Sequence, residues 1–335
     1  MNTIKTIQSR LNRKWTYTVR DTRGIIGLNE RLFKQARGAR ILVYHGICSS
    51  NPTRFNSLFL TARTFEQHLQ FYKKYFHIVS LDEYYEQQFR GNKFNVCLTF
   101  DDGFANNYEY VLPLLNKYEV PATFFVTGIR NAGYDILWND FLAIAQEFGP
   151  PEFECQREIF VRNNQMAYVS MVEGRPLKEL LREEGFKKKA ELIQILQCFL
   201  SPDIMEKVKV YWMQMTSSQI KELSGSPFAT IGCHGYYHND LARIPVRDMQ
   251  EELIQSRRFL ENLIQKPVDT LAFPYGSYSR ETITVSKSLG FTKLLAAEFL
   301  FPEDSSDPTL RERFIVNPYI SVNNQMLATI HGKYC

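Results

Sequence analysis

The sequence predicts an α/β fold, a closed or nearly closed barrel of strands and helices. Two observations favour this class. From residue 39 onward, short apolar runs alternate with stretches of helical periodicity, which is the signature of parallel strands joined by crossover helices. The chain also has 335 residues, of which 44% are hydrophobic, enough for a sizeable core in one barrel domain that carries insertions. This composition excludes disordered, collagen-like and coiled-coil proteins.

Eight apolar runs are the candidate strands. They cover residues 40–45, 77–81, 95–100, 122–127, 230–234, 270–273, 291–295 and 314–316. Helical patterns lie between them. Thr64-Phe-Glu-Gln67 is typical of a capping box that opens a helix, with one apolar face made of Phe65, Leu69, Tyr72 and Phe76. A second helix is expected over residues 246–265, because four apolar residues are spaced for burial there: Met249, Leu253, Leu260 and Leu263.

Two segments do not follow this alternation of strands and helices. Residues 139–214 are longer than any crossover, contain Pro150-Pro151 and include a helix-like stretch over 186–200, so we expect an inserted, mostly helical subdomain there. Its neighbouring strands place it at the active face of the barrel, as a lid or as one wall of a cleft. Residues 1–39 form a basic N-terminal extension, and the barrel is expected over 40–335, interrupted by 139–214.

Charge is distributed unevenly along the chain. The net charge is +4, but residues 1–40 contain ten Lys or Arg against Asp21 and Glu30, so this segment is +8 and the remainder is −4. The barrel is therefore not a nucleic-acid platform, and we expect no nucleic-acid partner. Apolar residues are interleaved with the basic ones: Trp15, Tyr17, Ile25, Ile26 and Leu32. Two interpretations stay open, namely contact with an anionic membrane surface and a solvated, partly helical arm.

The sequence also predicts a compartment. It contains no apolar stretch long enough for a membrane span and no N-terminal signal peptide, which predicts a cytoplasmic protein, with peripheral membrane contact as the open alternative. Six scattered cysteines without a Cys-x-x-Cys pair fit reduced thiols: Cys48, Cys97, Cys155, Cys198, Cys233 and Cys335. Of these, Cys97 and Cys233 lie in apolar runs and are expected to be small buried hydrophobes.

A pair of carboxylates follows the strand at 95–100. Asp101-Asp102-Gly103 would lie at the carboxyl end of that strand, where α/β barrels place their active sites. One carboxylate there is able to bind a cation while the other remains free as a base. The alternative is a simple turn in which one carboxylate caps the following helix.

A second strand end supplies imidazoles. The strand at 230–234 ends in His234-Gly-Tyr-Tyr-His238, and histidines four residues apart are able to face one centre. One Asp and two His leave a coordination position open for water, as expected of a catalytic metal site. A third strand end, at 271–276, adds Pro274-Tyr275-Gly276 to the same rim, with a plain turn as the alternative.

Taken together, these motifs resemble those of the polysaccharide deacetylases, carbohydrate esterase family four. The resemblance rests on Thr99-Phe-Asp-Asp-Gly103, His234-x-x-x-His238 and Phe273-Pro-Tyr-Gly276, supported by Val43-Tyr-His-Gly46, Pro121-Ala-Thr-Phe-Phe-Val126 and Arg313-Phe-Ile-Val316. It implies a distorted (β/α) barrel of about seven strands with a helical insertion. It also implies a hydrolase that removes N-acetyl or O-acetyl groups from sugars with a divalent metal, commonly zinc, with cobalt, manganese or nickel as alternatives.

The resemblance also assigns roles. It implies that Asp102, His234 and His238 hold the metal, that Asp101 is the general base, and that the backbone amide of Tyr275 helps to bind the oxyanion. Substrate contacts would come from aromatic faces able to stack on sugar rings and from the third motif: Tyr236, Tyr237, Pro274 and Tyr275.

Four departures from the family pattern leave questions open. The Arg that orients the base is replaced by Ala272, and Arg313 is either its substitute or a structural residue. The Ser or Thr after the first His is Gly235. The fourth-motif Trp has no obvious counterpart among Trp15, Trp138 and Trp212. The His of the fifth motif, the general acid, is matched only loosely by His331, with His45 as an alternative.

Two classes of function therefore remain. The first is a metal-dependent deacetylase that acts on carbon–nitrogen bonds of an acetylated glycan or glycan precursor, in polysaccharide biosynthesis. The second is a catalytically impaired carbohydrate-binding or scaffold protein that retains the barrel. A hydrolase of another amide, such as a small nitrogenous compound, is a third possibility. The sugar, the linkage and the oligomeric state are not predicted.

Overall fold

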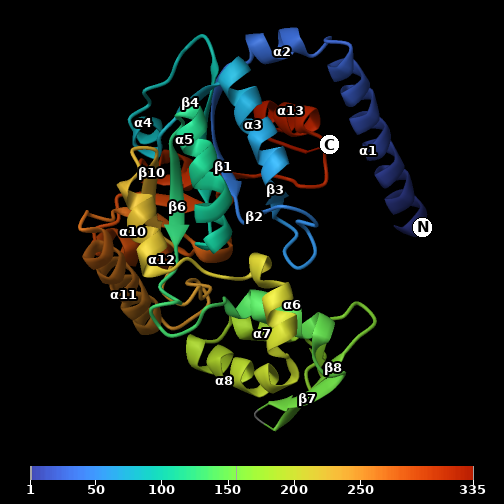
Figure 1. Ribbon diagram of the computed structural model, residues 1–335, viewed down its shortest axis with the longest axis vertical. Coiled ribbons are helices and arrows are strands. Elements are labelled where there is room, and N and C mark those ends of the chain that lie inside the picture. The colour runs from blue at the N-terminus through green and yellow to red at the C-terminus, as the bar shows by residue number, and fades with distance from the viewer. Residues whose placement is uncertain (1, 156, 335) are drawn as a thin grey trace.

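Parallel strands form the main sheet of the protein, shown in Figure 1 as a computed structural model. The structure describes the backbone of residues 2–155 and 157–334 and the side chains of residues 12–155 and 157–334. Cys335 and the side chains of Lys5 and Arg10, which entered the sequence analysis, lie outside the described residues. Within the described chain the main sheet has nine strands, in the order β13-β12-β11-β10-β6-β5-β1-β14, with β4 pairing with β5 beside this path. Their bounds are β1 Gly38–Tyr44, β4 His77–Val79, β5 Phe94–Phe100, β6 Ala122–Val126, β10 Ala229–Cys233, β11 Thr270–Ala272, β12 Lys293–Ala296, β13 Leu310–Glu312 and β14 Phe314–Ile315.

One residue brings the two ends of this sheet together. Strands β13 and β14 lie at opposite ends of the strand order, yet only Arg313 separates them in the chain. The sheet therefore nearly closes, and all its ladders are parallel. This confirms the predicted (β/α) barrel, and all eight predicted strands are present. The short strand β13 was not predicted.

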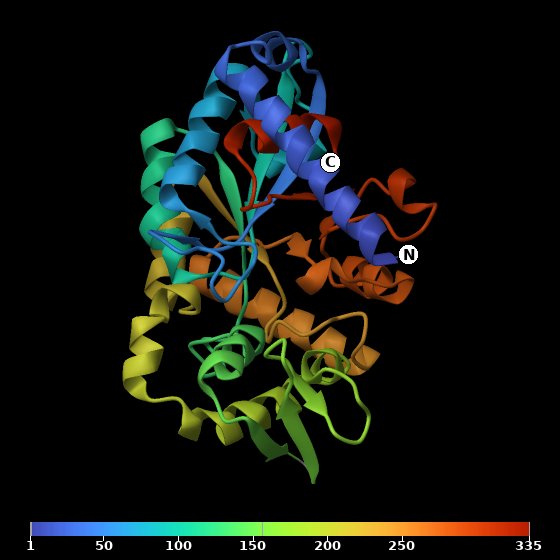
Figure 2. The same cartoon turned by 90° about the vertical axis from the view of Figure 1, so that its right-hand side faces the viewer.

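Helices cover the outside of the barrel (Figures 1 and 2). They are α3 Ala62–Tyr75, α4 Leu81–Tyr85, the π-helix η1 Asn107–Val111, α5 Leu112–Tyr118, α10 Ser217–Gly225, α11 Val246–Ile264, α12 Arg280–Ser288 and α13 Val322–His331. The predicted apolar face of α3 is confirmed, because Phe65, Leu69, Tyr72 and Phe76 are buried. The predicted capping box is wrong by three residues, since the cap is Thr61, whose hydroxyl accepts from the Thr64 amide.

Strand periodicity decides which side chains reach the barrel interior. In β5, Val96, Leu98 and Phe100 face the outer layer of helices, whereas Cys97 belongs to a small interior cluster. Successive side chains of a strand alternate between faces, so Thr99 and Asp101 continue the interior row. The ladder pairs Val43 with Thr99 and Tyr44 with Phe100, which places His45 beside Asp101 at the rim.

The insertion lies beyond the end toward which β6 points (Figure 1). It contains α6 Trp138–Phe148, α7 Leu177–Arg182, α8 Phe186–Leu196, α9 Pro202–Lys207 and the 3-10 helices η2 Gln197–Phe199 and η3 Lys209–Tyr211. It also contains an antiparallel sheet, β7 Glu152–Cys155, β8 Glu158–Arg162 and β9 Tyr168–Ser170, which the prediction of a mostly helical segment missed. Its own apolar core reaches the barrel rim through Phe59 and Phe104.

The N-terminal extension forms α1 Asn2–Ile25 and α2 Glu30–Gln35. Helix α1 packs across α13 (Figure 2), where Asn324 Nδ2 donates to Tyr17 O over 3.1 Å and Asn323 Nδ2 donates to Arg20 O over 3.0 Å. Among the described residues, no helix combines the length and the apolar character needed to cross a membrane. The remaining elements are β2 Ile47–Cys48, β3 Leu60–Thr61 and the 3-10 helices η4 Pro274–Gly276 and η5 Asp304–Ser306.

Candidate active site

The carboxyl ends of four barrel strands surround one cavity of about 260 Å³. Because the strands are parallel, residues that directly follow them gather on the same rim. His45 follows β1, Asp101 and Asp102 follow β5, His234 follows β10, and Tyr275 follows β11; all of them line this cavity. The insertion supplies another wall through α6 and Lys178.

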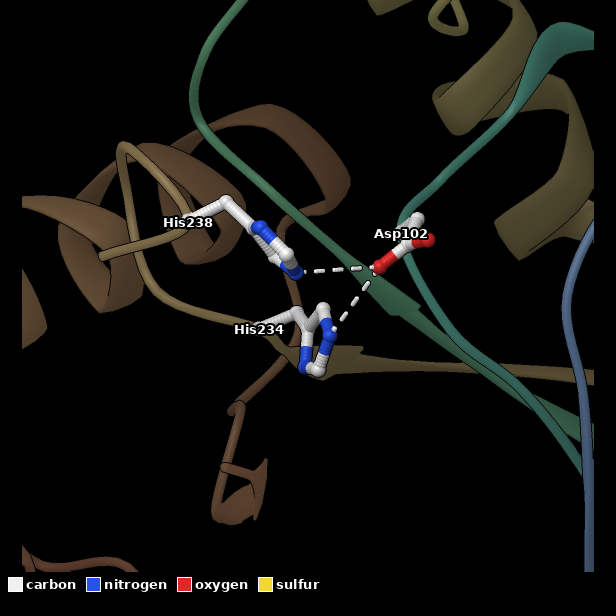
Figure 3. Close-up of side chains that lie close together, drawn as sticks. All are labelled: Asp102, His234 and His238. Atoms are coloured by element: carbon white, nitrogen blue, oxygen red, sulfur yellow. Dashed lines mark ion pairs between the residues drawn. The ribbon is translucent and has the colours of Figure 1, made fainter. Parts of the chain in front are cut away.

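Three side chains of the cavity converge on one point (Figure 3). Asp102 Oδ1 lies 3.3 Å from His234 Nε2 and 3.1 Å from His238 Nε2, and all three residues are buried. Ligand atoms of a tetrahedral zinc site with bonds of about 2.0–2.1 Å are about 3.4 Å apart. The observed separations and the N, N, O donor set therefore fit a divalent metal such as zinc. No other cluster of three His, Cys, Asp or Glu residues within the described chain has this arrangement.

The backbone around these side chains is held in an unusual conformation. The φ angles of Asp102, His238 and Tyr275 are 76°, 57° and 61°, in the left-handed region that non-glycine residues seldom occupy. Such conformations cost free energy and are found mostly where the surrounding structure imposes them, often at functional sites. At Asp102 the bend turns its carboxylate away from that of Asp101, so that the two neighbours face different partners.

The other nitrogen of each histidine is also bound. His234 Nδ1 donates to Ala272 O over 2.8 Å, and His238 Nδ1 lies 3.2 Å from Tyr275 Oη. A carbonyl only accepts, so the proton of His234 is fixed on Nδ1 and its Nε2 is the nitrogen that can bind a metal. Burial raises the pKa of Tyr275 well above its usual range, so its hydroxyl stays protonated.

Electrostatics keep the metal-facing carboxylate charged. Burial alone would raise the pKa of Asp102, but hydrogen bonds and the nearby His234 and His238 hold it well below its usual range. Burial lowers the pKa of His238, whereas for His234 the charges of Asp101 and Asp102 outweigh burial and raise it. An ionised carboxylate beside two imidazoles is a suitable ligand set for a cation.

Arg313 pairs with Asp101, where the Arg absent at Ala272 would be expected to act. Its Nη1 and Nη2 each lie 2.7 Å from one oxygen of Asp101, and its Nη1 also donates to Thr99 Oγ1 over 3.2 Å. Burial would raise the pKa of Asp101, but the Arg313 guanidinium brings it below its usual value. The guanidinium thus comes from the closure of the barrel, at the junction of β13 and β14, and it orients a charged carboxylate at the position expected of the base.

A buried glutamate holds the loop between the two histidines. Glu252 Oε1 on α11 accepts from the amides of Tyr236 and Tyr237 over 3.1 and 3.0 Å, and Oε2 accepts from Asn239 Nδ2 over 2.7 Å. A Cβ added at Gly235, whose φ is +73°, would lie 2.8 Å from Glu252 Oε1. Glycine replaces the family's hydroxyl residue here because the carboxylate occupies the space and supports the loop.

The predicted substrate-binding tyrosines need correction. Tyr236 and Tyr237 line a separate groove of about 790 Å³, together with Phe186 of the insertion, and they do not line the cavity of the metal ligands. Tyr236 packs over Gly128, and Tyr237 stacks on Phe186 with ring centroids 4.5 Å apart. Both point away from the cavity because the loop turns sharply at Gly235 and His238, whose φ angles are 73° and 57°. Pro274 is buried beneath the loop, so Tyr275 is the only one of the four that lines the cavity.

The two candidates for the general acid are separated by the structure. His331 ends α13, is exposed, and precedes Gly332, which packs against Arg40 at the opposite end of β1 from the cavity. Its assignment as the acid is therefore wrong: the helix carries it to the far side of the strand. His45 lines the cavity with a buried Nδ1 that has no hydrogen-bond partner among the described residues. Burial lowers its pKa.

The first turn of α6 contributes residues that sequence reasoning missed. Trp138 is fully buried, and its Nε1 donates to His238 O over 3.2 Å. Asn139 and Asp140 line the cavity, and Asp140 is buried. A signal was present, since Trp138-Asn-Asp140 follows soon after the strand at 122–127 and hence near the active rim. Assigning the segment to an insertion concealed it.

Comparison with known proteins agrees with this geometry. The family model described as polysaccharide deacetylase matches residues 90–151 and 204–294, the two stretches that carry Asp101–Asp102 and His234–Tyr275. The matched residues, 153 of 335, resemble the polysaccharide deacetylase family. A relative within the family, YxkH of Bacillus subtilis, whose name assigns it to the same family, is 20% identical over 263 residues, which is 75% of this chain. The chain spans 61% of the length of that relative.

Solved deacetylase structures share the barrel. The Streptococcus pyogenes deacetylase PplD, solved in complex with acetate, superposes with a TM-score of 0.57 at 18% identity over 87% of this chain and 97% of that chain. IcaB from Ammonifex degensii gives a TM-score of 0.53 at 18% identity, over 88% and 98% of the two chains. At this identity the comparison establishes the fold.

Proposed function

We propose that the protein is a metal-dependent deacetylase that removes an acetyl group, most favourably N-acetyl, from a sugar of a polysaccharide or glycan precursor. The observation that supports this proposal is the convergence of Asp102, His234 and His238 beside Asp101, which Arg313 holds in its charged form. Zinc is the proposed metal, because two imidazole nitrogens and one carboxylate are its usual ligands in catalytic sites. A bound divalent metal acidifies a water molecule and polarises the acetyl carbonyl.

The residues of this chain divide the remaining work. Asp101 accepts the proton of the attacking water, and its bidentate contact with Arg313 fixes both its orientation and its charge. The backbone amide of Tyr275 is the proposed donor to the developing oxyanion, as the family resemblance implies. The cavity of about 260 Å³ is large enough for an acetamido group, and burial of the groups that line it strengthens their electrostatic interactions.

Acetate release tests the proposal. We expect metal-dependent release of acetate from N-acetylglucosamine oligomers with added zinc or cobalt, and a loss of about 10²-fold or more in the Asp101→Asn variant. A wild-type protein that binds zinc but releases no acetate from N-acetylated or O-acetylated glycans would support the alternative, a carbohydrate-binding or scaffold protein. Release of ammonia or acetate from small amides alone would indicate the third class.

We also propose that helix α1 rests on an anionic membrane. Trp15 and Val19 are 72% and 38% exposed, and their spacing of four residues puts them on one side of the helix. Ile26, which directly follows the helix, is 63% exposed. Tyr17 and Arg20 occupy the opposite side, where their carbonyls bind α13. Exposed Arg or Lys residues occur in the same N-terminal segment: Arg13, Lys14, Arg23 and Arg31. Apolar residues bordered by positive charge suit the surface of an anionic bilayer.

Vesicle sedimentation tests this surface. The protein should bind vesicles containing phosphatidylserine more strongly than pure phosphatidylcholine vesicles, and binding should weaken as salt screens the charges. Replacing Trp15 and Ile26 by aspartate should abolish binding. Val172→Asp is the matched control, because Val172 is 80% exposed but lies on the insertion. Equal binding by both variants would contradict the proposal.

A further inference from the structure

Asp140 is a carboxyl group of the cavity that the functions assigned so far do not use. It belongs to the first turn of α6, is 4% exposed, and lines the same cavity as Asp101 and the three metal-binding side chains. Because α6 belongs to the insertion, this group does not come from a barrel strand. The insertion therefore contributes a titratable side chain to the cavity.

The two oxygens of Asp140 have different surroundings. Oδ1 accepts from Asn139 Nδ2 over 3.3 Å, and the Asn56 amide also hydrogen-bonds to the carboxyl group. Oδ2 is buried and has no hydrogen-bond partner among the described residues. A buried charged oxygen without a partner costs several kcal/mol, whereas a neutral carboxyl group avoids much of this cost. Burial and the charge of Asp102 accordingly raise the pKa of Asp140 well above its usual range.

Amide hydrolysis requires a second proton transfer besides that to Asp101. The departing amine is a poor leaving group unless its nitrogen is protonated as the carbon–nitrogen bond breaks. Asp101 is held as a carboxylate by Arg313, which suits a proton acceptor. Burial keeps His45 in its neutral form, and Lys178 is exposed at the mouth of the cavity. The protonated hydroxyl of Tyr275 contacts His238 Nδ1. Asp140 is the carboxyl group of the cavity whose surroundings favour the protonated form.

We propose that Asp140 is the general acid, which donates its proton from the buried carboxyl group to the leaving nitrogen of the acetamido sugar. This inference rests on the proposed function. In this step the carbon–nitrogen bond breaks and the nitrogen takes the Asp140 proton and leaves as the free amine. The acyl carbon keeps the hydroxyl that came from water and leaves as acetic acid, which loses its proton to solvent. Asp101 keeps the proton taken from water. After product release Asp101 loses that proton to solvent, and Asp140 regains one.

The leaving group of the substrate provides a test that a structural role would not mimic. A 4-nitrophenolate leaves without protonation, so 4-nitrophenyl acetate needs the base but little help from an acid. We expect Asp140→Asn to lower acetate release from N-acetylglucosamine oligomers by about 10²-fold or more, and hydrolysis of 4-nitrophenyl acetate by much less. Asp101→Asn should lower both rates by similar factors. Across a series of phenyl acetates, the Asp140→Asn rate should depend more steeply on the acidity of the leaving phenol than the wild-type rate.

Matched variants separate the outcomes. Glu147→Gln changes an exposed carboxylate at the other end of α6, paired with Arg54, and should leave both rates unchanged. If Asp140→Asn does not fold, Asp140→Ser provides the same comparison. If Asp140→Asn lowers the rates of amide and ester hydrolysis equally, Asp140 has a structural role. If Asp140→Asn keeps the full rate of amide hydrolysis, the general acid is Asp101. Either result overturns the inference. A wild-type protein inactive on both substrates would instead refute the proposed function, and one active only on the ester would refute both.

Discussion

Replacing Arg313 by methionine is expected to destabilise the protein and to disable its base. The Arg313 and Asp101 side chains are only 2% and 6% exposed, so solvent does not screen the pair. Methionine removes the guanidinium while keeping most of the side-chain volume, which leaves the Asp101 carboxylate buried without its partner. Removal of one member of a buried ion pair typically costs about 3–5 kcal/mol. We therefore expect the free energy of unfolding at pH 7 to fall by about 3–5 kcal/mol.

The loss of unfolding free energy in Arg313→Met should increase with pH. In the wild type the pKa of Asp101 is lowered, so the stability from the pair is complete above the ordinary carboxyl pKa of about 3.9 and is lost as pH falls through the lowered value. Without Arg313, burial raises the pKa of Asp101, so the variant loses stability as pH rises through that raised value. The difference in stability between wild type and variant should therefore widen with increasing pH.

Urea denaturation at several pH values measures this difference. Arg311→Met is the matched control, since Arg311 lies two residues away on β13 and donates to the carbonyls of Asp307 and Leu310. We expect it to cost about 1 kcal/mol. In the double variant with Asp101→Asn, part of the Arg313→Met loss should be recovered, because no charge remains buried. A loss below about 1 kcal/mol in Arg313→Met, or one that is constant between pH 5 and pH 8, would refute the reasoning.

Three further predictions concern the metal ligands, the residue behind one of them and the thiols. His234→Ala and His238→Ala should each lower zinc affinity at least about 10-fold, as measured by equilibrium dialysis, and unchanged stoichiometry in both would contradict the ligand assignment. Tyr275→Phe removes the hydroxyl that lies 3.2 Å from His238 Nδ1 and leaves the backbone amide in place, and it should weaken zinc binding by about 10-fold. If the variant binds zinc as tightly as the wild type, the contact between Tyr275 and His238 does not support the metal ligand. In thiol labelling of the native protein, exposed Cys198 should react quickly, and three buried thiols should react only after unfolding: Cys48, Cys97 and Cys233. Burial shields these thiols and also raises the pKa of Cys48 and Cys233 to about 11. Rapid labelling of Cys233 in the native protein would contradict its buried position.

Local sequence was enough to find the barrel and most of its site. Apolar runs mark buried parallel strands directly, because both faces of such strands are covered and most residues in them are apolar. The residues that follow these runs are then known to share one rim. This is why Asp101, Asp102, His234 and Tyr275 were found together without a structure, and why the chain showed its family through them.

Contacts between distant segments required the tertiary structure. The link between Arg313 and Asp101 spans more than two hundred positions and exists because the barrel closes at the junction of β13 and β14. The sequence of the loop 234–238 does not reveal the turns at Gly235 and His238, which direct Tyr236 and Tyr237 into a groove separate from the cavity. His331 matched a motif by spacing alone, and only the path of α13 shows that it ends far from the rim.

The sequence by itself determined the fold class and predicted the three proposed metal ligands and the proposed base, because each depends on which residues follow a strand. Only the tertiary structure decided what surrounds them: the guanidinium that charges Asp101, the glutamate that holds the histidine loop, and the placement of Asp140 inside the cavity. The physical reason is that burial and electrostatic pairing depend on distance in space. Residues from the insertion and from the last strands reach the site only after the chain has folded around it.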